Sequence, residues 1–168
     1  IHTLSLFKKS GFRAIFPENY QSLCCGQPFD SLKDLKATEL STNKVNNALL
    51  KASNNGEYPI YADNAPCALR LQEAQESGLL DKRLRLYDAA TFLAENILPK
   101  LKINHKRKKL NVHIPCSTTK MNSADALLKI AGAVTESLST TGIACCGYAG
   151  DKGMFLPELN DNGLRLLK

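Results

Sequence analysis

A Cys-Cys-Gly sequence occurs twice in this chain and constrains its fold more than any other feature. The first copy is Cys24-Cys25-Gly26 and the second is Cys145-Cys146-Gly147. Two further cysteines each follow a proline, at Cys67 and at Cys116. All six cysteines therefore belong to four short motifs, and the repetition predicts two related halves of one fold.

Adjacent cysteines are better suited to binding a soft metal than to pairing with each other, because a disulfide between neighbours closes a strained ring. Thiolates are preferred ligands of iron-sulfur clusters and of zinc. The glycine after each pair allows a tight turn that can aim both sulfurs at one point. The alternative is that each cysteine is only a small buried apolar residue. The candidate site residues are Cys24, Cys25, Cys67, Cys116, Cys145 and Cys146.

The composition is typical of a soluble globular protein. The chain has 168 residues, of which 43% are hydrophobic and 23% are charged. It contains no apolar run of membrane-spanning length, and the segment that begins at Ile1 does not have the order of a signal peptide. We expect a cytoplasmic site of action. Six cysteines in such a chain indicate metal or redox use rather than a secretory disulfide framework.

The net charge of +6 is concentrated in the segment His105-Lys106-Arg107-Lys108-Lys109. Such a cluster can contact nucleic acid or an anionic membrane. We interpret it instead as a solvated loop before a strand. Because Trp is absent and aromatic residues make up only 7% of the chain, we expect no nucleic-acid partner.

The hydrophobic pattern predicts an α/β fold with two βαβ-type halves, about residues 1–80 and 81–168, in one cysteine-rich domain over 1–168. Strands are predicted at 12–16, 58–62, 110–114 and 142–144, and helices at 4–10, 31–51, 68–75, 86–97 and 127–138. The cysteine motifs would then follow the carboxyl ends of strands, along one rim of a parallel or mixed sheet. Sites in open α/β sheets form at that edge.

Nucleotide-binding motifs are absent from the sequence. Neither a Gly-x-Gly-x-x-Gly fingerprint nor a phosphate-binding loop occurs. The glycine-rich segment 147–153 does not have the required spacing, and we interpret it as a flexible loop around the second cysteine pair.

The cysteine motifs resemble those of the CCG domain, which occurs in the cysteine-rich subunit of heterodisulfide reductases and in the iron-sulfur parts of glycolate- and lactate-oxidising enzymes. The chain is most similar to the carboxyl-terminal region of FAD-linked D-lactate dehydrogenases. The resemblance rests on residues 23–29, 113–117 and 145–151, with 155–159 behind the last, and spans Cys24 to Leu159.

This resemblance implies an electron-transfer module. In the parent protein, a flavin domain with FAD would oxidise a 2-hydroxy acid, and ferredoxin-type and CCG domains would pass electrons to a membrane quinone. By position, the six cysteines would be ligands of a 4Fe-4S type cluster or redox thiols, and no catalytic residue is assigned. The resemblance places the parent in the cytoplasm or on the inner face of the membrane.

The chain departs from the family pattern in its number of ligands. Asn64 stands where some relatives have a cysteine, and neither half contains four thiols. The chain begins without Met and ends in an amphipathic pattern, so we expect a fragment of a larger protein. We expect this fragment not to oxidise lactate, and its cluster can be absent even where the parent has one.

Two other functions are compatible with the cysteines. Four of the thiols could form a structural zinc site, although Cys-x-x-Cys knuckles are missing. A thiol-disulfide enzyme could use Cys145 or Cys116 as its nucleophile.

Four other polar residues near the cysteine motifs have alternative roles. We interpret His113 as a strand residue rather than as a ligand or proton donor, and Asp151 and Glu158 as cap or surface residues. Lys152 could stabilise an anionic cluster.

Overall fold

The computed structural model describes residues 2–148 and 152–167. The chain divides into two compact units, Ile1–Phe92 and Leu93–Lys168, here called unit 1 and unit 2. Both units combine helices with one pair of parallel strands, so the α/β class is confirmed.

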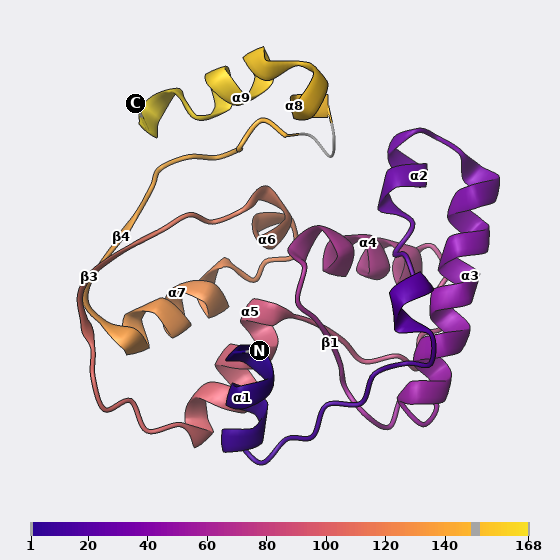
Figure 1. Cartoon of the computed structure of the whole chain (residues 1–168), viewed down its shortest axis with the longest axis horizontal. Coiled ribbons are helices and arrows are strands. Elements are labelled where there is room, and N and C mark those ends of the chain that lie inside the picture. Colours follow the sequence, from indigo (N-terminus) through magenta and orange to yellow (C-terminus); the bar gives the residue numbers. More distant parts are fainter. Residues whose placement is uncertain (1, 149–151, 168) are drawn as a thin grey trace. The chain divides into compact units, whose positions relative to one another are not determined.

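Unit 1 is mainly helical and has one short parallel strand pair (Figure 1). Its elements are α1 (His2–Lys9), a 3₁₀ turn (Tyr20–Ser22), α2 (Gln27–Ser31), α3 (Leu35–Ala52), β1 (Ile60–Ala62), α4 (Ala65–Glu76), β2 (Leu86–Asp88) and α5 (Ala89–Phe92). In the strand pair, Ile60 lies opposite Leu86 and Ala62 lies opposite Asp88. Because α4 lies between the two strands in the sequence, β1, α4 and β2 form a βαβ unit.

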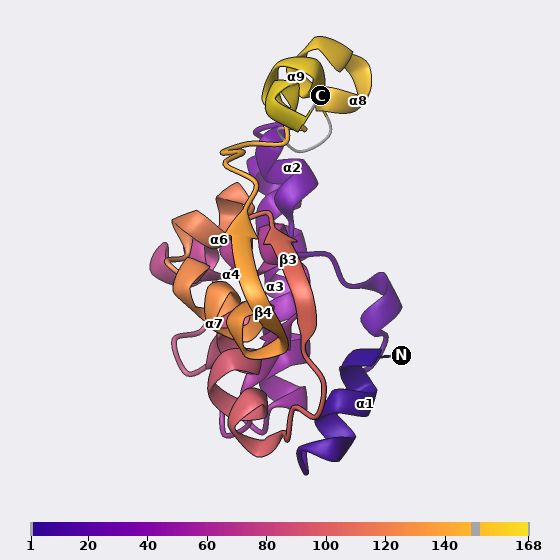
Figure 2. The ribbon, with the colours of Figure 1, turned by 90° about the vertical axis from the view of Figure 1, so that its left-hand side faces the viewer.

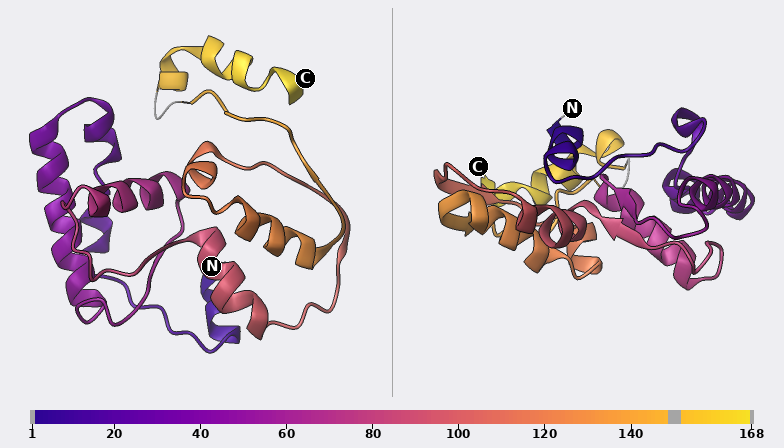
Figure 3. Two further views of the ribbon diagram at one scale, coloured as in Figure 1. Left: turned by 180° about the vertical axis from the view of Figure 1, so that it is seen from behind. Right: turned by 90° about the horizontal axis from the view of Figure 1, so that it is seen from below.

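The core of unit 1 lies around α3 and α4, and Figure 3 shows α4 running across α3 rather than parallel to it. The buried residues of this core are Val45, Leu71, Ala74, Leu80 and Leu84. Helix α3 begins at a cap in which the Asp34 carboxylate accepts a hydrogen bond from the backbone N–H of Ala37 at 2.9 Å. Cys25 packs against the same core, so the first cysteine pair is attached to the best-buried part of unit 1.

A cluster of aromatic rings holds α1 against the strands of unit 1. Phe7 is only 7% exposed, and its ring lies 5.0 Å from the ring of Tyr61 and 5.7 Å from that of Phe92, both in edge contacts. Edge-to-face aromatic pairs add stability beyond the area that they bury. The segment of Phe12, predicted as a strand, is irregular, but the Phe12 ring contacts Phe92 at 5.6 Å.

Unit 2 also contains one parallel strand pair. Its elements are a π-helical turn (Leu93–Ile97), a 3₁₀ turn (Leu98–Lys100), β3 (Arg107–Val112), α6 (Cys116–Lys120), α7 (Ala124–Val134), β4 (Thr135–Thr140), α8 (Lys152–Phe155), α9 (Pro157–Gly163) and a final 3₁₀ turn (Arg165–Leu167). Arg107 pairs with Thr135 and Val112 pairs with Thr140. Figure 2 shows β3 and β4 side by side, with α6 and α7 on the connection between them.

The predicted helices are largely present, but one of them begins and another ends in the wrong place. The helix predicted over 86–97 begins as strand β2 and becomes helical only at Ala89. The helix predicted over 127–138 ends at Val134, where β4 begins. Val134 and Leu138 are four residues apart, a spacing that fits one helical face, but positions four apart also lie on one face of a strand. Pairing with β3 decides in favour of the strand.

The predicted strand at 142–144 is wrong, since β4 lies earlier in the sequence. The interpretation of the basic segment as a loop is also wrong in part. Arg107, Lys108 and Lys109 are exposed residues of β3.

The prediction of one continuous sheet rim is not met in the described residues. Their strands form two separate pairs, and the first Cys-Cys-Gly does not follow a strand, because residues 12–16 are irregular. The described helices include none that is both long and apolar enough to cross a membrane.

Candidate thiol site

Cys25 and Cys67 meet in unit 1, although they are 42 residues apart in the sequence. Their Sγ atoms are 3.1 Å apart and hydrogen-bonded. Cys25 directly precedes the Gly26 that caps α2, and Cys67 lies in the first turn of α4. Both side chains are half-buried. One member of a Cys-Cys-Gly motif and one Pro-Cys cysteine therefore form a thiol pair.

The start of α4 fixes the position of Cys67. Asn64 is the N-cap of this helix, and its side-chain oxygen accepts a hydrogen bond from the backbone N–H of Cys67 at 3.4 Å. Pro66 occupies the first turn, where its missing N–H costs nothing. Asn64, the position at which the chain departs from the CCG pattern, thus has a structural role beside the thiol pair.

Two contacts fix the position of Cys25. The Ser41 hydroxyl on α3 donates a hydrogen bond of 2.8 Å to the carbonyl of Cys24. Gly26 has φ +88°, a left-handed conformation that a side chain disfavours. This turn leads directly into α2, and the predicted tight turn after the first cysteine pair is confirmed.

The hydrogen bond between the two sulfurs dominates the electrostatics of the site. When Cys25 loses its proton, the hydrogen bond with Cys67 stabilises the thiolate and lowers the pKa of Cys25 to about 6, although burial acts in the opposite direction. The pKa of Cys67 is raised, because its hydrogen bond to Cys25 and its burial both favour the protonated thiol. A further contribution to the low pKa of Cys25 comes from the positive charge of Arg70.

Arg70 was not identified from the sequence. It lies on α4, three residues after Cys67, and is only 5% exposed. Its Nε atom has no hydrogen-bond partner in the described residues. The signal in the sequence was an arginine between Ala68 and Leu71, on a helix whose other buried residues are apolar.

The three cysteines of unit 2 lie at comparable positions in the chain. Cys116 is exposed and begins α6, directly after Pro115. Cys145 is exposed and Cys146 is half-buried. Gly147 has φ +78°, so the second Cys-Cys-Gly turn also uses a left-handed glycine.

The second cysteine pair is held by α9. A Cβ atom on Gly147 would lie 2.1 Å from the carbonyl oxygen of Leu159, and one on Gly163 would lie 2.8 Å from the carbonyl oxygen of Cys145. The Asn160 amide donates a hydrogen bond of 3.0 Å to the Cys146 carbonyl. Gly147 and Gly163 therefore allow the backbone of α9 to lie directly on the backbone of the second cysteine pair. The residues that follow this pair in the sequence thus pack against it.

The other polar candidates have structural surroundings. His113 Nδ1 lies 3.3 Å from Thr141 Oγ1, which links the end of β3 to the residue after β4. Glu158 is an exposed residue in the first turn of α9. Lys152 begins α8, and Asp151 lies outside the described residues.

No group of three or more His, Cys, Asp or Glu side chains that could hold a metal ion occurs in residues 2–148 and 152–167. The structure thus brings Cys25 and Cys67 together, and the described residues do not complete a metal site around them.

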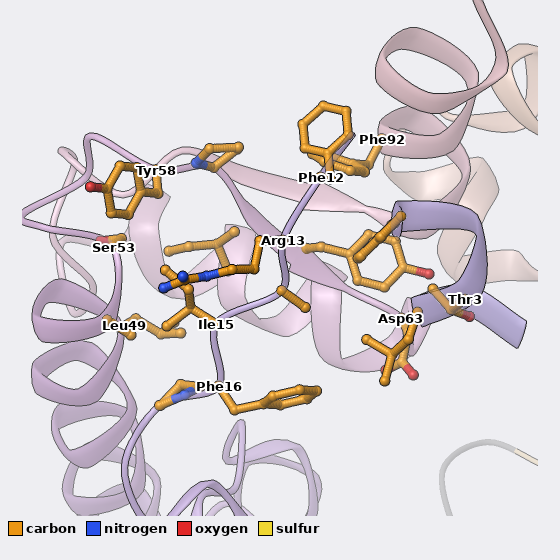
Figure 4. Close-up of a pocket in the computed structure, with 18 residues that line it drawn as sticks. Thr3, Phe12, Arg13, Ile15, Phe16, Leu49, Ser53, Tyr58, Asp63 and Phe92 are labelled. Atoms are coloured by element: carbon orange, nitrogen blue, oxygen red, sulfur yellow. The ribbon is translucent and has the colours of Figure 1, made fainter. Parts of the chain in front are cut away.

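A pocket of unit 1 has no cysteine in its lining. Its volume is about 690 Å³, and it lies between α1, the segment of Phe12 to Pro17, α3 and β1. Figure 4 shows Arg13 and Ile15 in this pocket, with Phe12 beside Phe92 at one side. Most of its lining is apolar or aromatic. No motif indicated this pocket in advance, because its walls come from segments far apart in the chain.

Comparison with known proteins finds no relative of this chain. No protein-family model, curated protein or solved structure matches it. The interpretation of the thiol site therefore depends on its own residues and on the resemblance of its motifs.

We expect the alkylation of Cys25 by iodoacetamide to accelerate with a midpoint near pH 6. The thiolate is the reactive form, so the rate rises as pH increases through the lowered pKa of about 6. The Cys24→Ser variant allows the measurement, because Cys25 is then the only thiol of tryptic peptide 14–33. Adding Cys67→Ala removes the hydrogen bond and should move the midpoint to higher pH. An unchanged midpoint would contradict the assignment of its cause.

Proposed function

We propose that this chain is the cysteine-rich electron-transfer module of an FAD-linked 2-hydroxy-acid dehydrogenase of the D-lactate type. A flavin domain of the parent would supply the electrons, and a membrane quinone would accept them. The observation that supports the proposal is the convergence of Cys25 and Cys67 from segments 42 residues apart. Thiols that meet in this way, beside a buried arginine, are suited to redox chemistry.

The proposal includes a relation between the two units. In each unit, a strand leads to a Pro-Cys motif at a helix start, and a parallel strand follows. In each unit, the glycine of Cys-Cys-Gly has a left-handed backbone. The order differs, because Cys-Cys-Gly precedes the strand pair in unit 1 and follows it in unit 2. These likenesses support related halves, and the different order argues against a simple tandem copy.

A 4Fe-4S cluster is only partly matched by the residues present. Such a cluster takes four thiolates, whereas each unit has three cysteines, Cys24, Cys25 and Cys67 in unit 1 and Cys116, Cys145 and Cys146 in unit 2. The donor atoms are of the right kind, but in the described residues no three of them are grouped. A complete set would require ligands beyond the three thiols of one unit.

Anaerobic reconstitution with iron, sulfide and a small thiol tests the proposal, because the added thiol can complete an incomplete ligand set. We expect bound iron and sulfide with visible absorbance. The double variants Cys25→Ser/Cys67→Ser and Cys145→Ser/Cys146→Ser compare the two units. Each variant should lose the iron and sulfide that are bound by the unit in which it is substituted. A wild-type chain without iron after reconstitution with the added thiol, or equal iron in all three proteins, would refute cluster binding by the cysteines of this chain.

A second candidate function is thiol-disulfide redox chemistry without a metal. It is favoured by the 3.1 Å distance between two sulfurs that have no third ligand group around them in the described residues. The structural zinc alternative has no such support, since a structural zinc ion takes four ligands.

A further inference from the structure

We infer that Cys25 and Cys67 are a redox-active dithiol that a low-molecular-weight disulfide converts into an intramolecular disulfide bond. The Sγ atoms are 3.1 Å apart, and a disulfide bond is about 2.05 Å long. An approach of about 1 Å is therefore sufficient. This inference does not depend on the proposed cluster binding, because it requires no metal.

The local structure favours Cys25 over Cys24 as the partner of Cys67. Packing against the core holds Cys25 beside Cys67. A bond between Cys24 and Cys25 would instead strain the ring formed by neighbouring residues. Residues 23–25 belong to no helix or strand, so the approach of about 1 Å requires no change in hydrogen bonds within a helix or strand.

Arg70 favours a reversible bond over a permanent one. Its side chain is buried, its Nε atom lacks a hydrogen-bond partner, and it forms no ion pair in the described residues. A buried positive charge is costly without a nearby negative charge. The carboxylates of Asp30, Glu39 and Glu73 line the same pocket as Arg70, and the Cys25 thiolate adds a further negative charge in the reduced form, which oxidation removes. Arg70 is thus a positioning residue that favours reduction of the disulfide.

The reaction proceeds by two thiol-disulfide exchange steps. The Cys25 thiolate attacks one sulfur of the small disulfide RSSR, forms a mixed disulfide and releases RS⁻. Cys67 then loses its proton and attacks the Cys25 sulfur, which forms the Cys25–Cys67 bond and releases the second RS⁻. The two protein thiols lose two electrons and two protons in total, and RSSR is reduced to two RSH.

Peptide mapping of the full chain tests the inference. The metal-free protein is incubated with oxidised glutathione, its remaining thiols are blocked, and it is digested with trypsin. Cleavage after Arg13, Lys33, Lys51 and Arg70 yields peptide 14–33, with Cys24 and Cys25, and peptide 52–70, with Cys67. We expect these two peptides joined, with the loss of two hydrogen atoms, and we expect dithiothreitol to separate them.

Matched variants identify the sulfur that reacts. Cys24→Ser should retain the joined peptides, whereas Cys25→Ser and Cys67→Ser should abolish them. Three results would overturn the inference: joined peptides in Cys25→Ser, a bond confined to peptide 14–33, or a stable glutathione adduct of Cys25 in the wild type. The result for the wild-type chain does not depend on whether any variant folds. The Arg70→Gln variant should form a disulfide that is harder to reduce. If reconstitution leaves the chain without iron while the bond still forms, the proposed cluster binding is refuted and this inference is retained.

Discussion

Oxidation of the Cys25–Cys67 pair is expected to raise the thermal unfolding midpoint of unit 1 by at least about 15 °C. The bond would close a loop between residues 42 apart, and the resulting restriction of the unfolded chain is worth about 4 kcal/mol. For a unit of this size, 1 kcal/mol corresponds to a shift of roughly 4–8 °C. Even the lower end of that range gives a large change.

Circular dichroism melts of the oxidised and reduced full chain measure this shift. Hydrogen exchange of the α3 and α4 amides assigns the change to unit 1, whose core these helices form. The Cys25→Ser variant, treated with the same oxidant, is the control and should melt at one temperature before and after treatment. Equal midpoints in a wild-type chain whose bond is confirmed by mapping would show that the unfolded chain already holds the two cysteines close together.

The substitution Gly147→Ala is expected to release α9 from the second cysteine pair. The new side chain would adopt φ +78°, which costs roughly 1–2 kcal/mol, and its Cβ would lie 2.1 Å from the Leu159 carbonyl oxygen. The loop at Gly147 and α9 cannot both keep their positions. Because α9 has only seven residues, it is too short to remain helical without this contact.

Hydrogen exchange at the N–H of Leu164, which donates a 2.8 Å bond to the Asn160 carbonyl, reports the loss of α9. We expect its protection to fall at least tenfold. Gly26→Ala is the matched control, because Gly26 also has a left-handed backbone but the nearest atom to its Cβ would be Thr42 Oγ1 at 3.5 Å. That variant should lower the stability of unit 1 only by the conformational cost of a left-handed backbone at residue 26. Equal loss of Leu164 protection in both variants would contradict the close contact between Gly147 and Leu159.

The helices were predictable from the sequence because their apolar residues recur at helical spacing. Val45, which lies in the helix predicted over 31–51, is buried on α3. The strands were less predictable. β2 has only three residues and β4 is mostly polar, so their positions depend on the strands with which they pair.

The candidate cysteines were predictable as a set, but their grouping was not. The sequence associates Cys24 with Cys25 because they are neighbours, whereas the structure joins Cys25 to Cys67. That contact depends on where the core places the start of α4, which is a long-range property. Arg70 was missed for the same reason, since only the tertiary structure shows that its charge is buried.

The exposed basic residues of β3 affect the self-association of the chain. In the described part of the chain, β3 pairs only with β4, and a strand with a free edge can recruit a strand from another molecule. Arg107, Lys108 and Lys109 give this edge a concentrated positive charge. Two copies approaching edge to edge would repel each other. Because salt screens such repulsion, with a Debye length of about 3 Å at 1 M, self-association through β3 should be favoured at high ionic strength.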